Sequence, residues 1–440
     1  MEKIYSNENF VVGLDIGTTK IATVVGYKNE DGQIEIIGWG KSKSTGVEFG
    51  QIQNLTKTIE GIQLSKELAA NHAGVEIENV YAGIAGHHIR TSKYRHIKYR
   101  LEKKKEIITE EEINDLKDEI WKVNVEAGER IIDVIPQNYI IDKHRETKSP
   151  VGELGSEIIG TYQIITGKDS EIEKILMCGK EADLQLNEII LEPIASSLAC
   201  LTEEEKKGVA LVDIGGGTTD LIIYVDGSPV FTKVISIGGD IITKDIAKVC
   251  KITEDTAENL KLKHGTCVVD KGNPGVLISI PKAHGQPVIQ INENYLAQII
   301  NCRVQGDILG ALKREIENSG YKEKLYSGIV LTGGGSQLRN IQELTQYTLG
   351  LSTRLGVPGV GFSRTIPNEL RNPMFSTVLG LLKYGIQVEE DKEPVEEEVT
   401  PRRKRKKVEN GSNKPGGSKK IWGMYRKIQD YVKSFTESCS

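Results

Sequence analysis

Long apolar runs, abundant aromatic residues and an excess of positive charge are all missing from this 440-residue chain. Aromatic residues make up 5% of it, and the formal net charge is −5. No run of about 18 apolar residues occurs, so we expect no transmembrane helix. The polar stretch Met1–Asn9 predicts no signal peptide. The negative net charge argues against general nucleic-acid binding.

Paired cysteines are missing as well. No Cys-x-x-Cys pair occurs and no histidine stands at metal-ligand spacing from the cysteines, which are at positions 178, 200, 250, 267, 302 and 439. This pattern is typical of reduced, mostly buried thiols in a cytoplasmic protein. His87 and His88 follow the predicted strand Asn79–Ala85 without a third ligand at recognisable spacing. We therefore expect a solvated strand end there rather than a metal site.

What the chain does contain is one short device twice. Val11–Lys20 reads VVGLDIGTTK, and Ala210–Asp220 reads ALVDIGGGTTD. Each copy predicts a buried strand that ends in an aspartate, a glycine turn with hydroxyl groups, and a second apolar strand. Two such hairpins that face each other would hold a polyphosphate from both sides.

The residue types in these turns suit phosphate chemistry. Glycine lets the backbone approach a phosphate closely, and successive N–H groups then form an anion-binding nest. Hydroxyl groups and a lysine add donors and charge, so the predicted phosphate-binding residues are Gly17, Thr18, Thr19, Lys20, Gly215, Gly216, Gly217, Thr218 and Thr219. Asp15 and Asp213 would lie beside the phosphates. Because carboxylates next to phosphate require a cation, the sequence predicts Mg²⁺ held by these two residues through water.

A third glycine turn follows a third apolar segment. Gly333, Gly334 and Gly335 come after Ser327–Thr332, and a turn without Cβ atoms lets a base or a sugar lie against the backbone. One strand–glycine turn alone would be an ordinary hairpin about half the time. Two matched copies and a third turn make coincidence improbable.

These three turns resemble the nucleotide-binding signature of the superfamily of actin, DnaK-type chaperones and sugar kinases. Leu191–Ala199 and Pro373–Leu382 match its two connecting helices. The resemblance implies a two-lobed, actin-like α/β fold of duplicated ribonuclease-H-like domains. It also implies ATP as the ligand, with its phosphates on the first two turns and its adenosine against the third.

The resemblance further implies that Glu192, in the first connecting helix, is catalytic and orients water. Glu192 is also the residue type that the helix dipole favours at a helix N-terminus, just before Pro193. The sequence leaves both interpretations open, and slow ATP hydrolysis is the most that we expect.

Within the superfamily, the chain resembles the FtsA family of bacterial actin homologues. Ala257–Gly265 is similar to that family's Ala-Glu-x-x-Lys…His-Gly helix, which implies that Glu258 and Lys261 approach the ribose and base. Alone, these two residues would be an i,i+3 surface ion pair. The family resemblance also implies filaments of the protein itself, binding to the C-terminal tail of FtsZ, and recruitment of later division proteins.

The sequence divides into six predicted segments. They are a first lobe (10–88 and 168–205), an inserted α+β subdomain (89–167), a second lobe (206–238 and 325–386) with its own insertion (239–324), a disordered linker (387–417) and an amphipathic helix (418–437). Asn54 predicts the cap of a helix that ends near Gly74.

The inserted subdomain carries its own local signals. Thr109 and Glu112 predict a capping box, and the helix after it would place Ile113, Leu116, Ile120 and Val123 on one face. Tyr139–Asp142 and Tyr162–Ile165 predict strands.

The C-terminal segment combines an apolar arc with basic edges. At about 100° per residue, one side of a helix would carry Ile421, Trp422, Met424, Tyr425, Ile428, Tyr431, Val432 and Phe435. This pattern, after the basic run Arg402–Lys407, predicts binding to anionic lipid. With the family resemblance, it predicts a peripheral protein on the cytoplasmic side of the inner membrane at the division site. The alternative is a helix docked on the core, which the polar linker disfavours.

Three other functions are possible on this fold: a small-molecule kinase, a chaperone ATPase, and a pilus-assembly actin homologue of the PilM kind. A kinase would leave the terminal helix unexplained, and no peptide-binding domain follows residue 386. PilM-like proteins lack the linker and amphipathic helix of residues 386–440. The sequence therefore favours the FtsA interpretation.

Overall fold

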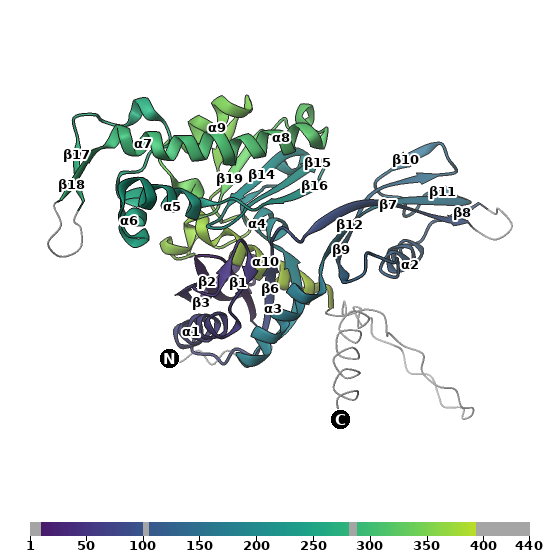
Figure 1. Cartoon of the computed structure of the whole chain (residues 1–440). Helices are drawn as coiled ribbons and strands as arrows, with labels where there is room; N and C mark the ends of the chain where they lie inside the picture. The colour runs from purple at the N-terminus through teal and green to yellow at the C-terminus, as the bar shows by residue number, and fades with distance from the viewer. Residues whose placement is uncertain (1–9, 100–104, 281–287, 393–440) are drawn as a thin grey trace. The chain divides into compact units, whose positions relative to one another are not determined.

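The computed structural model describes residues 10–99, 105–280 and 288–392 (Figure 1). Met1–Val388 is one compact unit. The predicted amphipathic helix lies outside the described residues, as does the linker from 393 onward. Helix α10 (Ser376–Lys392) covers the first residues of the segment predicted as linker.

Two five-stranded sheets with the same topology form the framework of this unit. Their orders are β13-β6-β1-β2-β3 and β20-β19-β14-β15-β16. In each, three strands form an antiparallel meander and two more add in parallel to its first strand. The strands are β1 (Val11–Ile16), β2 (Lys20–Lys28), β3 (Ile34–Lys43), β6 (Asn79–Ile84), β13 (Gln185–Leu191), β14 (Gly208–Ile214), β15 (Thr219–Val225), β16 (Ser228–Ile235), β19 (Ile329–Thr332) and β20 (Thr353–Leu355). The predicted duplication in an actin-like α/β fold is confirmed.

The helix predicted to follow the first meander is α1 (Leu55–Ala73). Its N-cap Asn54 accepts a hydrogen bond from the Lys57 N–H, and its C-cap Gly74 has φ 69°, a left-handed conformation that glycine adopts without strain. Helix α1 packs with α3 (Asp169–Glu181) on the core of the first sheet. The predicted boundaries of α1 are confirmed because both ends are set by local signals.

Two connecting helices join the lobes. Helix α4 (Glu192–Cys200) and helix α10 touch where a Cβ on Gly380 would lie 1.7 Å from the Ala195 carbonyl oxygen. One buried cluster combines side chains from β2, β14 and α10, among them Val24, Leu211 and Val378. The lobes therefore share a core beneath the hairpin turns.

The inserted subdomain is a four-stranded antiparallel sheet with a helix on one face (Figure 1). Its strand order is β10 (Arg145–Thr147), β9 (Glu129–Ile141), β12 (Glu157–Lys168) and β7 (Arg90–Tyr99), and a small pair, β8 (Glu106–Ile107) and β11 (Leu154–Gly155), lies beside it. Helix α2 (Glu110–Ile120) starts with the predicted capping box of Thr109 and Glu112. The prediction that Val123 belongs to this helix is wrong, because the helix ends at Ile120.

Strand β9 is much longer than the predicted Tyr139–Asp142. Pro136 hides its first half, since proline is rare inside strands. The structure tolerates Pro136 because it pairs with Tyr162 next to a register shift, on a stretch of β9 that β10 does not cover. Strand β12 likewise extends well beyond Tyr162–Ile165.

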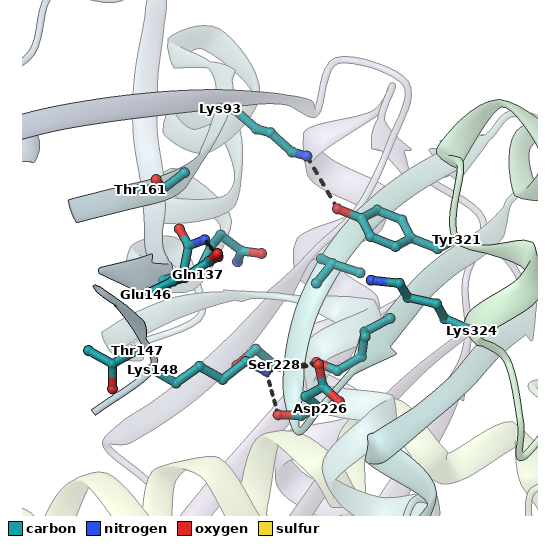
Figure 2. A pocket seen from close by; sticks show the side chains of 13 residues that line it. Lys93, Gln137, Glu146, Thr147, Lys148, Thr161, Asp226, Ser228, Tyr321 and Lys324 are labelled. Carbon is teal, nitrogen blue, oxygen red and sulfur yellow. Dashed lines mark hydrogen bonds and ion pairs between the residues drawn. The ribbon is translucent and has the colours of Figure 1, made fainter. Parts of the chain in front are cut away.

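The open face of the inserted sheet meets the second lobe across a polar groove of about 470 Å³ (Figure 2). Lys148 Nζ donates 2.7 Å to the Asp226 carbonyl, and Gln137 donates 2.8 Å to the Pro229 carbonyl. Lys93 Nζ donates 3.2 Å to the Tyr321 hydroxyl. These few polar contacts resemble a transient interface more than a shared core.

The second-lobe insertion packs helices on a small hairpin. Its elements are α5 (Gly239–Cys250), α6 (Glu254–His264), β17 (Leu277–Ile280), β18 (Ile289–Asn292), α7 (Glu293–Asn301), a π-helical stretch (Cys302–Ile308) and α8 (Leu309–Ser319), with α9 (Ile341–Leu349) beside it. Four described cysteines are buried and Cys302 is exposed, so the prediction of mostly buried thiols is confirmed for these. None of the described helices is long and apolar enough to span a bilayer.

Candidate functional site

The turns of the two hairpins touch each other. A Cβ on Gly216 would lie 2.4 Å from Cγ2 of Thr19, and a Cβ on Gly217 would lie 2.7 Å from the hydroxyl of Thr18. Thr18 in turn accepts a 3.1 Å hydrogen bond from the Gly50 N–H. The structure thus brings the two predicted phosphate turns together, and the close approach explains why the second turn carries glycines.

The two turns have the same length, although their residues differ. Ile16 pairs with Ile21 and Ile214 with Thr219, so each turn has four residues. The cross-turn hydrogen bonds match too, from Gly17 to Lys20 at 3.0 Å and from Gly215 to Thr218 at 2.9 Å. Gly216 and Gly217 therefore occupy the places of Thr18 and Thr19, and the two Thr-Thr pairs are not equivalent. The Thr219 hydroxyl donates to the Ile237 carbonyl rather than into the turn.

Buried carboxylates gather beneath the turns. Asp213 accepts hydrogen bonds from Ser196 (2.7 Å) and Thr377 (3.3 Å), one from each connecting helix. Asp15 is ion-paired with Lys20. Sequence reasoning missed Asp220, which lies directly across the β14–β15 ladder from Asp213. The signal was the four-residue turn, which places these two aspartates opposite each other.

The carboxylates oppose one another's ionisation. Burial, then the Asp213 carboxylate, raises the pKa of Asp220 well above its ordinary value. Burial and the charge of Asp15 raise the pKa of Asp213, although the Ser196 hydrogen bond lowers it. The Oδ1 atom of Asp220 is buried without a hydrogen-bond partner in the described structure. A bound cation would stabilise the charged forms of these carboxylates.

Glu192 joins this cluster from the first residue of α4. A Cβ on Gly83 would lie 2.8 Å from Cγ of Glu192, so the bare backbone of β6 makes room for its side chain. Burial raises the pKa of Glu192 well above its ordinary value, and the charges of Asp15, Asp220 and Asp213 add to the shift. Glu192 is thus both a helix N-terminal residue and a member of the acidic cluster.

Helix α5 begins at the second turn. The Gly239 N–H donates a 2.8 Å hydrogen bond to the Gly215 carbonyl, and the Asp240 N–H donates one of 2.8 Å to the Gly216 carbonyl. Lys261 donates to the Gly239 carbonyl at 3.0 Å and pairs with Glu258 at 2.7 Å. The predicted ribose-binding pair is therefore an i,i+3 ion pair that also contacts the start of α5, next to the second turn.

The third glycine turn lies against the second. A Cβ on Gly333, which has φ 83°, would lie 2.2 Å from Oδ1 of Asp213. A Cβ on Gly335 would lie 2.5 Å from Cγ2 of Ile214, whereas one on Gly334 would meet nothing closer than 3.9 Å. Two of these glycines thus allow close packing, and Gly334 provides the open backbone that a base needs.

The prediction of a solvated strand end at His88 is wrong. His88 is only 3% exposed, whereas His87 is exposed. Burial lowers the pKa of His88 to about 4, so the ring is neutral at physiological pH. The sequence could not show this burial, because the inserted subdomain begins at β7 and covers the ring. Among the described residues, no three His, Cys, Asp or Glu side chains are placed together to hold an ion.

Replacing His88 with glutamine is expected to make the stability less sensitive to acid. Unfolded His88 takes up a proton near pH 6.5, but folded His88 does so only near pH 4. The unfolded state therefore binds more protons between these values, and the free energy of unfolding falls as the pH falls through them. Between pH 7 and pH 5, the free energy of unfolding measured with urea should fall by about 2 kcal/mol less in His88→Gln than in the wild type. An unchanged pH dependence, equal to that of His87→Gln, would contradict the burial.

Comparisons with known proteins now bear on identity. The family profile "Cell division protein FtsA" matches residues 210–380, and the profile "SHS2 domain inserted in FTSA" matches residues 86–166. Over 383 residues the chain is 33% identical to the cell division protein FtsA of Pseudomonas aeruginosa, covering 87% of this chain and 90% of that protein. The chain belongs to the FtsA family. The corresponding protein of Neisseria meningitidis is 34% identical over 384 residues, with 87% and 91% covered.

The FtsA assignment confirms the resemblance seen in the sequence and gives the chain an actin-like cell-division role. Solved structures agree on the fold. The PilM-PilN type IV pilus biogenesis complex has a TM-score of 0.62 at 17% identity, covering 86% of this chain and 98% of that one. MreB5 of Spiroplasma citri bound to ADP has a TM-score of 0.53 at 15% identity, covering 87% and 98%. At such identities the likeness shows the fold alone, so the FtsA relatives decide against the pilus and kinase alternatives.

Proposed function

We propose that this FtsA protein binds ATP with Mg²⁺ between its two hairpin turns and uses the bound nucleotide to control assembly. The observation that carries the proposal is the pair of glycine turns in contact above Asp213 and Asp220. MreB5 of Spiroplasma citri, which shares the fold, is bound to ADP, and this supports a nucleotide as the ligand.

The chemistry of the acidic cluster fits Mg²⁺. The pKa values of Asp213 and Asp220 are raised, and Oδ1 of Asp220 is buried without a hydrogen-bond partner among the described residues. Mg²⁺ keeps several waters and needs few protein carboxylates, so Asp15 and Asp213 would hold it through water beside the phosphates. Bound Mg²⁺ would supply charge neutralisation there. Glu192 would orient a water by accepting its proton, and slow hydrolysis is the most that follows.

Nucleotide between the lobes would hold them in one relative position. Filament contacts would then be in register, and the inserted subdomain would supply one of these contacts and recruit later division proteins. Because the groove between this subdomain and the second lobe is polar and holds few contacts, a small lobe movement would change it.

The anchor is proposed from sequence. The arc of Ile421, Trp422, Tyr425, Ile428, Tyr431, Val432 and Phe435 would lie in the inner-membrane interface, attracted by anionic lipid. Filaments would multiply this weak affinity, since many anchors act together. The protein would then bind the C-terminal tail of FtsZ and so tether FtsZ to the membrane at the division site.

Sedimentation with liposomes tests this function most directly. Anionic vesicles, ATP and a peptide of the FtsZ C-terminal tail are added in all combinations. Binding to vesicles should rise with ATP, and peptide should be retained only with protein. Sedimentation that is indifferent to ATP, together with no heat of ATP binding by calorimetry, would refute the proposal.

Alanine at Glu258 is expected to lower ATP affinity about tenfold, since one ribose hydrogen bond is worth roughly 1.4 kcal/mol. Glu258 also pairs with Lys261, which binds the Gly239 carbonyl at the start of α5, so part of the loss would come from that lysine. Glu254→Ala on the same helix, which is exposed, is the matched control. Equal affinities of the two variants by calorimetry would leave Glu258 as an ion pair without a ligand role.

A further inference from the structure

A small cavity in the first lobe is lined by Glu192 and His88. Its polar lining is Gln51, His88, Glu171 and Glu192, and apolar side chains such as Ile16 and Ile84 close it. About 10 Å³ of it is open to the centre of a water-sized sphere. At least one water fits in such a space, and a nucleotide does not.

His88 lines this cavity and carries a ring nitrogen without a hydrogen-bond partner among the described residues. The Gln51 amide nitrogen lies 3.1 Å from Nδ1 of His88. If the amide donates, Nδ1 accepts and the ring proton is on Nε2, an assignment that follows from the hydrogen bond. Nε2 is buried, and no described residue is its partner. A buried polar group without a partner is costly, and water is the usual remedy.

Both carboxylates that line the cavity can accept from such a water, and Glu192 is the one that has no donor among the described residues. Glu171 is already bound by Lys174 at 2.9 Å. Among the described residues, none donates a hydrogen bond to the Glu192 carboxylate, while Asp15, Asp220 and Asp213 repel its charge and Lys20 attracts it. Its carboxylate therefore needs a donor to fix its direction.

We propose that one water molecule in this cavity bridges Nε2 of His88 and the carboxylate of Glu192, and that His88 is thereby the positioning residue for Glu192. The water donates to Glu192 and accepts from Nε2, so each group gains the bond it lacks. The use of this positioning for ATP chemistry rests on the proposed function, but the bridge itself does not.

The bridge also reaches the root of the inserted subdomain. His88 stands two residues before β7, and a Cβ on Gly167, near the end of β12, would lie 3.4 Å from Cδ2 of His88. The ring thus lies beside the end of β12 and close in sequence to the start of β7. A change in the orientation of the Glu192 side chain would therefore act first on the part of the inserted subdomain next to His88.

A crystal structure of the nucleotide-free protein that shows ordered waters is the first test. We expect one water within hydrogen-bond distance of both Nε2 of His88 and a Glu192 oxygen. A dry cavity, or a water that does not contact Glu192, would overturn the proposal. This result does not depend on any variant folding or on ATP.

Infrared titration of the Glu192 carboxyl, identified by its loss in Glu192→Gln, is the second test. His88→Phe keeps a ring but removes the donor, so the titration midpoint of Glu192 should rise by about one pH unit. His88→Gln can restore a donor and should stay close to wild type, as should the exposed control His87→Phe. An unshifted midpoint in folded His88→Phe, or equal shifts in all three variants, would refute the positioning role. If ATP fails to bind the wild type while these shifts appear, only the proposed function fails.

Discussion

Valine in place of Gly216 is expected to abolish ATP binding in a chain that still folds. A Cβ at this position would lie 2.4 Å from Cγ2 of Thr19 and 3.0 Å from both carboxylate oxygens of Asp240. The two hairpin turns would have to separate, and the new methyl groups would stand where the backbone must approach phosphate. We expect affinity to fall roughly a hundredfold or more, about 2.7 kcal/mol.

Calorimetry with ATP and Mg²⁺ measures this loss. Gly306→Val is the matched control, because a Cβ on Gly306 meets nothing within 4 Å and the residue is exposed in a helix. Circular dichroism and thermal unfolding verify that both variants are folded. A folded Gly216→Val protein with wild-type affinity would show that phosphate does not lie between the turns.

Glutamate in place of Trp422 is expected to release the protein from anionic liposomes. The charge would fall within the apolar arc, where burial of an unpaired carboxylate is costly. Bound protein should drop at least about tenfold, since a full aromatic side chain is worth roughly 1.5–3 kcal/mol of burial. Raising the salt should weaken wild-type binding only in part, because screening reaches the lysines but not the apolar face.

Ser434→Glu is the control for this experiment, since at about 100° per residue Ser434 would fall outside the predicted arc and receives the same charge. ATP affinity should be unchanged in both variants. A chain that ends at Glu390 yet still sediments with liposomes would disprove the anchor. It would also remove the basis for placing the protein at the membrane.

Local signals made the largest features predictable. The capping box of Thr109 and Glu112 and the caps of α1 at Asn54 and Gly74 each depend on a few neighbouring residues, so the structure reproduces them. The duplicated Asp–glycine turn predicted two sheets of the same topology. Where a local rule misled, a tertiary reason is visible. Pro136 disguised half of β9 because proline lacks the backbone N–H of a strand residue, and the sheet tolerates it because β10 does not cover that stretch of β9.

The candidate site divides in the same way. The sequence by itself determined that two hairpins of this composition exist, that they belong to an actin-like FtsA chain, and which glycines and aspartates they carry. Only the tertiary structure decided that Gly216 stands against Thr19 and that His88 is buried and lines a cavity together with Glu192. Composition and period fix local conformation and which face is apolar. Strand register and the approach of residues about 200 positions apart depend on how whole lobes pack, and no short stretch of sequence encodes that packing.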